Sequence, residues 1–241
     1  MKILITSGGT KVPIDRVRHI ANMSSGTFGS RIATEFLSQG HKVVFVRAKG
    51  SKSPFSKTID LDNEDFSLKD YTEFVEFYNE HYNNYFEYIY STYDEYVDVL
   101  DKVIFLEQPT HILLAAAVSD YGVENYTDGK VRSSAHMEIK LKPLDKVISK
   151  VKLWAPTAKL VGFKLLVDST EEELIEAAQK SISSNGCDLV VANDLRDIKG
   201  NSHKIHLVTK DGVNSYHEHP TVAKVTPQYL PKKVVEATLK L

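Results

Sequence analysis

Two short stretches decide the fold of this chain: Ile3-Leu4-Ile5-Thr6-Ser7-Gly8-Gly9-Thr10 and Ser24-Ser25-Gly26-Thr27-Phe28-Gly29. The apolar residues of the first predict a buried parallel strand that ends in glycines. The second opens a helical pattern with Phe28, Ile32 and Phe36 on one face, so a helix begins in glycine. Glycines let a ligand approach the backbone, and the free N–H groups of a helix N-terminus favour a phosphate or carboxylate. We therefore expect an anion at this turn.

The spacing of these glycines differs from the dinucleotide fingerprint, in which three glycines lie within one strand-to-helix turn. Here a whole loop, residues 11–23, separates the two stretches. An NAD site also needs an acidic residue after the second strand, where this chain has Arg47 and Lys49. An NAD(P)-dependent reductase stays an alternative, because these cations suit a 2′-phosphate. A non-catalytic nucleotide-binding protein, which needs only the glycines, is the other.

Length and composition predict one domain over residues 1–241. The chain has 241 residues, of which 42% are apolar, enough to bury a full core. Its formal net charge of −2 and the lack of a long apolar run argue against nucleic-acid and membrane partners. A strand begins almost at the N-terminus, so we expect no signal peptide. The single cysteine, Cys187, is expected to be a buried, inert thiol in a cytoplasmic protein.

Strand and helix patterns alternate along the chain. Strands are predicted at residues 3–7, 43–46, 85–90, 112–118, 160–165 and 189–192. Helices are predicted at residues 26–38, 94–106, 145–152 and 171–184, the last with a capping box of Thr170 and Glu173. The alternation predicts an α/β fold: a Rossmann-like, doubly wound, mostly parallel sheet with helices on both faces and its ligand at the carboxyl ends of the strands.

Two segments depart from this pattern, and a third is unusual in composition. Residues 137–141 alternate in polarity, and residues 204–216 form a hairpin pattern around Asp211-Gly212, so we expect a mixed sheet or a β-hairpin arm for dimerisation. Eight of the 12 tyrosines lie in residues 71–96, which lack basic residues and predict an amphipathic helix and an edge strand. The histidines around the hairpin are expected to be solvated rather than metal ligands: His203, His206, His217 and His219.

Candidate ligand-binding residues follow the carboxyl ends of the later strands: Ala115, Ala116, Ala117 and Asp120, then Phe163, then Asn193. Small side chains expose backbone amides, and a carboxylate accepts hydrogen bonds. An aromatic ring beside an amide suits a nucleobase, which stacks on one and hydrogen-bonds to the other. Residues 125–136 carry Lys130 and Arg132 among Gly, Ser and Thr, as in a lid that closes over a polyphosphate.

Separated motifs run in order from Met1 to about Lys210: Thr6-Ser7-Gly8-Gly9-Thr10-Lys11-Val12-Pro13-Ile14-Asp15, Val17-Arg18, Asn22-x-Ser24-Ser25-Gly26-x-x-Gly29, Ala115-Ala116-Ala117-Val118-Ser119-Asp120-Tyr121, Lys130-Val131-Arg132-Ser133-Ser134, Gly162-Phe163-Lys164-Leu165 and Val190-Val191-Ala192-Asn193-Asp194. In this order they resemble phosphopantothenate–cysteine ligase, also called phosphopantothenoylcysteine synthetase, of coenzyme A biosynthesis.

The resemblance implies a role for each candidate residue. The nucleotide phosphates would contact Gly8, Ser24, Gly26 and Gly29, and the base and ribose would contact Phe163 and Asn193. The substrate pocket would be formed by Asn22, Ala116, Ala117 and Asp120. Catalysis would fall to Asn22 at the activated carboxyl, to Asp120, and to Lys130 as the lid lysine over the triphosphate. Arg18 would bind the substrate phosphate in the neighbouring subunit of a homodimer, since arginine makes paired bonds to phosphate oxygens.

The implied reaction is a two-step ligation. A carboxylate oxygen of 4′-phosphopantothenate attacks the α-phosphate of a nucleoside triphosphate, and the amine of L-cysteine then opens the acyl-nucleotide. We expect no dedicated metal site, because Mg²⁺ can arrive with the nucleotide. The sequences of residues 7–13 and 132–134 resemble those of the eukaryotic, ATP-using members. Ser181 and Asn185 occupy positions where CTP-using bacterial members carry lysines. ATP is therefore expected, with CTP possible.

Overall fold

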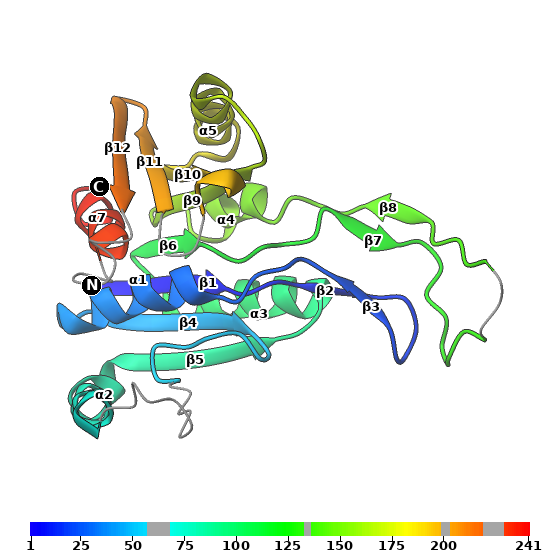
Figure 1. The fold of residues 1–241 in the computed structure, drawn as a ribbon, viewed down its shortest axis with the longest axis horizontal. Coiled ribbons are helices and arrows are strands. Elements are labelled where there is room, and N and C mark those ends of the chain that lie inside the picture. Colours follow the sequence, from blue (N-terminus) through cyan, green and yellow to red (C-terminus); the bar gives the residue numbers. More distant parts are fainter. Residues whose placement is uncertain (57–67, 133–135, 199–202, 219–228) are drawn as a thin grey trace.

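The computed structural model describes residues 1–56, 68–132, 136–198, 203–218 and 229–241. Its centre is an eight-stranded sheet in the order β12-β11-β10-β9-β6-β1-β4-β5 (Figure 1). The parallel strands are β1 (Lys2–Ser7), β4 (Lys42–Ala48), β5 (Tyr85–Tyr90), β6 (His111–Leu114), β9 (Lys159–Leu166) and β10 (Leu189–Asp194). Numbered among themselves, they lie in the Rossmann order 3-2-1-4-5-6. This confirms the predicted doubly wound sheet.

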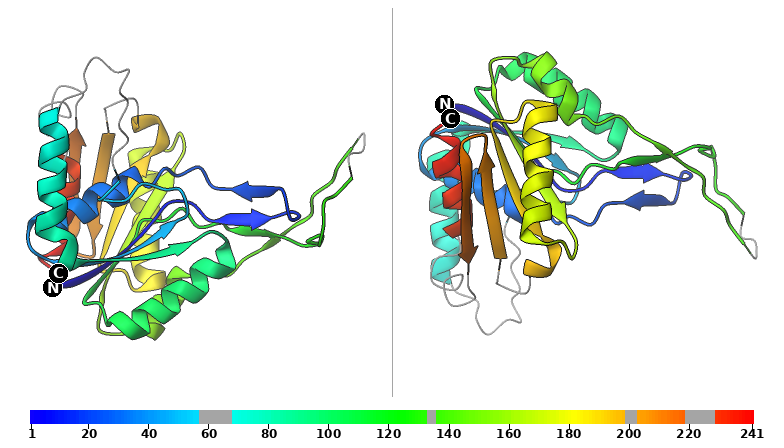
Figure 2. Two further views of the ribbon diagram at one scale, coloured as in Figure 1. Left: turned by 90° about the horizontal axis from the view of Figure 1, so that it is seen from below. Right: turned by 90° about the horizontal axis from the view of Figure 1, so that it is seen from above.

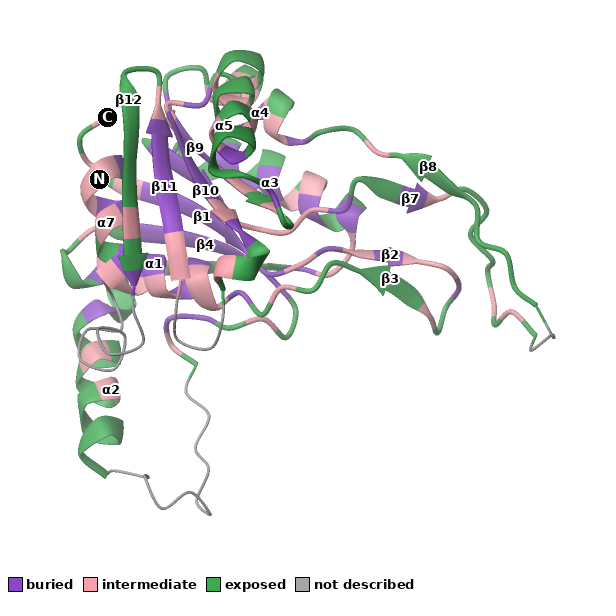
Figure 3. Cartoon of the chain, turned by 45° about the horizontal axis from the view of Figure 1, so that its top comes forward, coloured by how far each residue is buried: buried purple, intermediate pink, exposed green. Residues whose placement is uncertain are grey.

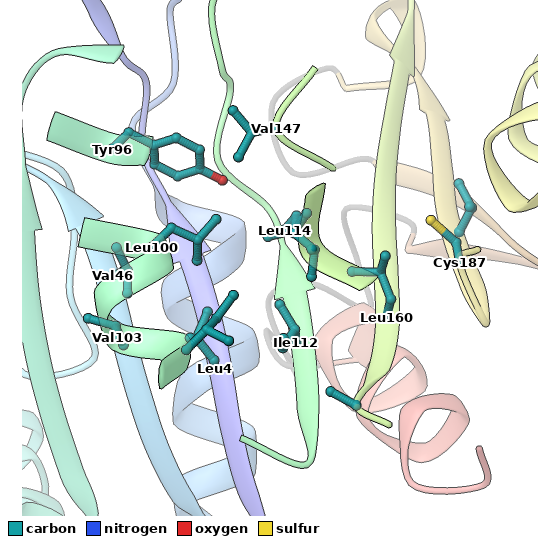
Figure 4. Close-up of a cluster of buried hydrophobic side chains, with 14 of the residues drawn as sticks. Leu4, Val46, Tyr96, Leu100, Val103, Ile112, Leu114, Val147, Leu160 and Cys187 are labelled. Carbon is teal, nitrogen blue, oxygen red and sulfur yellow. The ribbon is translucent and has the colours of Figure 1, made fainter. Parts of the chain in front are cut away.

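Helices cover both faces of the sheet. On one face lie α1 (Thr27–Ser38) and α7 (Tyr229–Thr238), with α2 (Leu68–His81) beside α1. On the other lie α3 (Tyr93–Glu107), α4 (Ile148–Trp154) and α5 (Glu171–Asn185), the last capped by Thr170 and Glu173 as predicted. A core forms on each face; Figure 4 shows Leu4, Ile112 and Leu160 of the strands with Tyr96 and Leu100 of α3. Because both faces are buried, the strands read as continuous apolar runs.

The predicted hairpin extends the main sheet and is not an arm. Strands β11 (His203–Thr209) and β12 (Gly212–Glu218) add antiparallel to β10, which confirms a mixed sheet. The tyrosine-rich segment forms α2, the short 3-10 turn η1 (Tyr82–Asn84), the edge strand β5 and the start of α3, as predicted. Cys187 is a free, buried thiol, also as predicted, and burial raises its pKa.

The arm lies elsewhere, at the carboxyl side of the sheet (Figures 1 and 2). It consists of the hairpin β2 (Lys11–Pro13) and β3 (His19–Ala21) and of the pair β7 (Tyr121–Val123) and β8 (Leu141–Pro143), with the described residues between them. The expected loop at residues 11–23 is therefore a hairpin, and only Leu141 of the expected strand 137–141 is in β8. Of the expected motifs, Ser133 and Ser134 lie outside the described residues.

The predicted strand 112–118 ends early, because β6 stops at Leu114. Beyond it the chain runs beside the end of β1: the Ala117 N–H donates to the Gly8 carbonyl at 2.8 Å, and the Thr10 N–H to the Ala117 carbonyl at 3.1 Å. The alanines thus leave the sheet as irregular chain with backbone near its carboxyl edge. In the described part of the chain, no helix combines the length and apolar composition that a membrane crossing requires.

Candidate functional site

A cleft of about 910 Å³ opens at the carboxyl ends of β6, β9 and β10 and at the N-terminus of α1. It lies beside the point between β1 and β6 where the strand order reverses, the usual ligand position in such sheets. Most predicted site residues line it: Asn22, Ser24, Gly26, Gly29, Ala116, Ala117, Asp120, Phe163 and Asn193. Gly8, Arg18 and Lys130 are not among the described residues that line it.

The N-terminus of α1 is shaped by close packing on β1. Gly26, the N-cap, has a φ of 74°, and the Ser7 hydroxyl donates to its carbonyl at 3.1 Å. A Cβ on Gly29 would lie 2.6 Å from the Ser7 Oγ, so only glycine fits there. Gly26 itself offers no side-chain cap, and although the Thr27 N–H donates to the Ser25 Oγ at 3.3 Å, the first turn of α1 lines the cleft, where its N–H groups favour an anion.

Gly8 is explained by packing. Its φ is 84°, and a Cβ there would lie 2.6 Å from the Cβ of Ala48. Its carbonyl accepts the Ala117 N–H, so Gly8 joins the two chain segments that leave β1 and β6. Its predicted contact with phosphate stays a prediction.

One end of the cleft carries Asn22 and Asp120. The Asn22 Nδ2 donates to the Val118 carbonyl at 3.1 Å, which orients the amide. Asp120 forms an ion pair with Lys146, which precedes α4 and also lines the cleft. Lys146 belongs to none of the sequence motifs, and nothing in the local pattern distinguishes it from other lysines near a helix start.

The other end of the cleft is aromatic. The ring of Phe28 lies edge-on to Phe163, with centroids 6.3 Å apart, and 5.1 Å from His203. Asn193 at the end of β10 lines the same wall with Arg31 of α1.

The predicted solvation of the hairpin histidines is wrong at two positions. His203 lines the cleft, and burial lowers its pKa to about 4. His206 is 2% exposed, with its Nδ1 2.8 Å from the Ser215 Oγ. His217 is exposed as predicted, and His219 lies outside the described residues. Strand β11 lies between β10 and β12 and is buried on both faces, with Ile205 and Leu207 in one core and Val208 in the other, and a strand pattern cannot show that.

Arg18 lies on the arm and is held in place. Its Nη2 donates to the Asp15 Oδ2 at 2.6 Å and to the Val131 carbonyl at 2.7 Å. Asp15 is 3% exposed, and Arg18 with the Val17 and Val131 N–H groups holds the pKa of Asp15 far below its usual range despite burial. Lys130 precedes Val131 and is exposed. Both predicted cations therefore belong to the arm rather than to the cleft of their own chain.

Metal-ligating side chains do not gather in the structure as described: it contains no group of three or more His, Cys, Asp or Glu arranged to hold an ion.

The family described as "DNA/pantothenate metabolism flavoprotein C-terminal domain" matches residues 1–63 and 94–235. The chain belongs to this family. The residues left unmatched between the two ranges include the described α2 and β5.

Relatives support the resemblance identified from the motifs. The chain is 34% identical over 210 residues to the coenzyme A biosynthesis bifunctional protein CoaBC of Thermococcus kodakarensis, covering 87% of this chain but 45% of that protein. It is 31% identical over 241 residues to the phosphopantothenate–cysteine ligase of Mus musculus, covering 87% and 76%. The chain thus spans about half the length of the bifunctional relative and is similar to members named as phosphopantothenate–cysteine ligases.

Solved structures of the family share the fold. A crystal structure of the DNA/pantothenate metabolism flavoprotein from Streptococcus pneumoniae has a TM-score of 0.75 and 27% identity and covers 100% of this chain and 97% of that one. The Cab2 mutant H337A, in complex with phosphopantothenate-cysteine, has a TM-score of 0.75 and 24% identity, with coverage of 100% and 89%. These likenesses confirm the Rossmann-like fold class.

Proposed function

We propose that the chain is a phosphopantothenate–cysteine ligase, which joins 4′-phosphopantothenate to L-cysteine through an acyl-nucleotide. One observation carries the proposal: a single cleft combines an uncapped helix N-terminus, an oriented Asn22 beside Asp120, and an aromatic wall with Asn193. This combination suits substrates that together carry a phosphate, a carboxylate and a heterocyclic base. The similarity to the mouse ligase supports the same assignment.

The reaction needs positioning more than covalent catalysis by the protein. A carboxylate oxygen of phosphopantothenate attacks the α-phosphorus of the nucleotide, and the bond to the bridging oxygen breaks to release pyrophosphate. The amine of cysteine then attacks the acyl carbon, the nucleoside monophosphate leaves, and the amine loses a proton. Holding these groups together supplies much of the rate. The Mg²⁺ that accompanies a nucleoside triphosphate is part of the substrate.

The residues of the cleft divide this work. The first turn of α1, with Ser24, Gly26 and Gly29, binds phosphate oxygens. Asn22 faces the acyl group, since its amide is fixed by the Val118 carbonyl. Ala116 and Ala117 leave room for the pantothenate chain, and Asp120, held by Lys146, accepts hydrogen bonds from it. Lys146 adds a cation near the anionic intermediate.

The arm supports a homodimer in which Arg18 and Lys130 serve the partner's cleft, Arg18 at the substrate phosphate and Lys130 over the triphosphate. A free two-stranded ribbon is marginally stable, and apolar exposure of this kind marks an interface. Figure 3 shows how exposed the arm is compared with the sheet. The large apolar side chains exposed on the arm are Val17, Ile20, Tyr121, Tyr126, Met137, Ile139 and Leu141.

ATP is the proposed nucleotide, with CTP as the second choice, and the free Cys187 agrees with a reducing, cytoplasmic setting. The reductase alternative loses one of its two cations, because Arg47 is paired with Glu87 at 2.8 and 3.0 Å.

The proposal is tested by incubating the purified chain with MgATP, phosphopantothenate and cysteine. We expect pyrophosphate only when phosphopantothenate is present, and phosphopantothenoylcysteine by mass spectrometry only when cysteine is added. If pyrophosphate were released equally fast without phosphopantothenate, the assignment as a phosphopantothenate–cysteine ligase would be wrong.

A further inference from the structure

Two buried polar atoms at the aromatic end of the cleft have no hydrogen-bond partner within the described part of the chain. Among the described residues, the His203 Nε2 and the Glu218 Oε1 are the buried side-chain atoms without a hydrogen bond. Glu218 is 3% exposed, and both residues line the cleft. Folded proteins satisfy nearly all buried polar atoms, and these two belong to register partners that line the cleft, where a ligand's polar atoms can complete them.

The sheet brings these residues to the nucleotide wall. His203 and Glu218 are register partners at the end of the β11–β12 ladder, on the same edge of the sheet as Asn193. Ile205 and Tyr216, each two residues away, pack on the α1 face, so His203 and Glu218 point to that face too. Phe163 also packs there, and Phe28 touches both Phe163 and His203. Only about two strand spacings of 4.8 Å separate β9 from β11.

The charges of this corner suit a neutral heterocycle. Burial keeps His203 uncharged at pH 7, with Arg31 opposing its protonation as well, so the imidazole has one donor and one acceptor nitrogen. Burial raises the pKa of Glu218, while Arg31 and the N–H groups of Leu230 and Tyr229 favour its charged form. The corner therefore places a neutral imidazole next to the Glu218 carboxyl, whose charged form Arg31 and the two N–H groups favour against burial.

We propose that Glu218 and His203 read the edge of the nucleobase: the Glu218 carboxylate accepts from an exocyclic amino group, and the His203 Nε2–H donates to the adjacent ring nitrogen. Adenine and cytosine both present this amino donor beside a ring acceptor. Hypoxanthine, guanine and uracil present a carbonyl beside an N–H, which leaves the carboxylate facing an oxygen. The inference rests on the proposed ligase function and extends it: ATP and CTP are accepted, and ITP, GTP and UTP are rejected.

ATP and ITP differ only at this edge, so they are the decisive pair. With phosphopantothenate and cysteine saturating, we expect kcat/KM for pyrophosphate release to favour ATP over ITP by about 10- to 100-fold. In Glu218→Gln the side-chain amide can donate to a carbonyl. We therefore expect kcat/KM to fall with ATP and to rise with ITP, so that the ATP-to-ITP ratio of kcat/KM falls at least about tenfold. His203→Phe keeps a ring against Phe28 but removes the donor, and should lower the ratio as well.

The matched control is His206→Gln, which changes a buried imidazole of the same strand that does not line the cleft; its ratio should equal that of the unaltered protein. Melting temperatures show which variants are folded, and His203→Phe carries the test if Glu218→Gln is not. Equal losses for ATP and ITP in the folded variants, or no preference for ATP in the unaltered protein, overturn the base-reading role and leave the ligase assignment standing. No pyrophosphate from any nucleotide overturns the ligase assignment instead.

Discussion

At the scale of single residues, the cleft depends on positions where one methyl group is too large. In Gly29→Ala the new Cβ would lie 2.6 Å from the Ser7 Oγ and 3.0 Å from the Ser7 Cβ. We expect the free energy of unfolding to fall by about 1–3 kcal/mol, measured by urea denaturation. The double variant Ser7→Ala/Gly29→Ala should lose less than the two single losses added together, because the clashing oxygen is gone. If the losses in the free energy of unfolding of the two single variants add up to that of the double variant, the introduced methyl group does not clash with Ser7.

A second residue, Lys146, has a role in the proposed mechanism because it forms an ion pair with Asp120 and both residues line the cleft. Lys146→Gln should slow pyrophosphate release about 10- to 100-fold, the weight of one charge-assisted hydrogen bond, with little change in melting temperature. Lys150→Gln is the matched control, since Lys150 pairs with Asp145 at 2.8 Å and does not line the cleft. Similar rates for both variants would remove Lys146 from the mechanism.

At the scale of elements, Asp194 ties the end of β10 to the turn before α5. Its carboxylate accepts from the Ser169 N–H at 2.8 Å, the Ser169 hydroxyl at 2.8 Å and the Arg196 N–H at 2.9 Å. Burial alone would raise the pKa of Asp194, but the N–H groups of Ser169 and Arg196 lower it to about 2. Since Asn193 is the preceding residue, these bonds also fix the wall of the cleft.

This pKa predicts how stability depends on pH. A carboxyl whose pKa is lower in the folded than in the unfolded chain stabilises the fold above its unfolded value, and that stabilisation disappears as the pH falls through the folded value. For Asp194 the interval runs from the ordinary 3.8 down to about 2. Urea unfolding at a series of pH values should show Asp194→Asn less stable at pH 7 and less sensitive to acid across this interval. An unchanged acid dependence would contradict the assignment.

At the scale of the whole molecule, the proposed homodimer would require the arm of one chain to complete the cleft of the other. Arg18→Ala and Asp120→Ala should each abolish activity in their homodimers. In an equilibrated mixture, each heterodimer would hold one site with both lesions and one with neither, so about a quarter of the full activity should return. Analytical ultracentrifugation tests whether the protein is a dimer, and native mass spectrometry of one tagged and one untagged variant tests whether the subunits exchange. No recovery despite exchange would mean that Arg18 serves its own chain.

Lys130→Gln mixed with Asp120→Ala extends the same experiment to the second cation of the arm. Because Lys130 adjoins Val131, whose carbonyl binds Arg18, the two cations should behave alike. Recovery with Arg18→Ala but not with Lys130→Gln would make Lys130 a lid over its own cleft.

The sequence by itself determined the parts of this protein that depend on local periodicity. Apolar runs such as Ile3-Leu4-Ile5, followed by glycines, indicated strands buried on both faces, and Gly26 and Gly29 marked the start of α1 because a bare backbone is required there. The ordered motifs then identified the family. The tertiary structure alone decided which residues meet. Asp120 and Lys146 are 26 positions apart, and the strand order that joins β11 to β10 turned His203 from an expected solvated residue into a wall of the cleft. Such residues come together because elements far apart in the sequence pack against each other. The sequence pattern of a single segment does not contain that information.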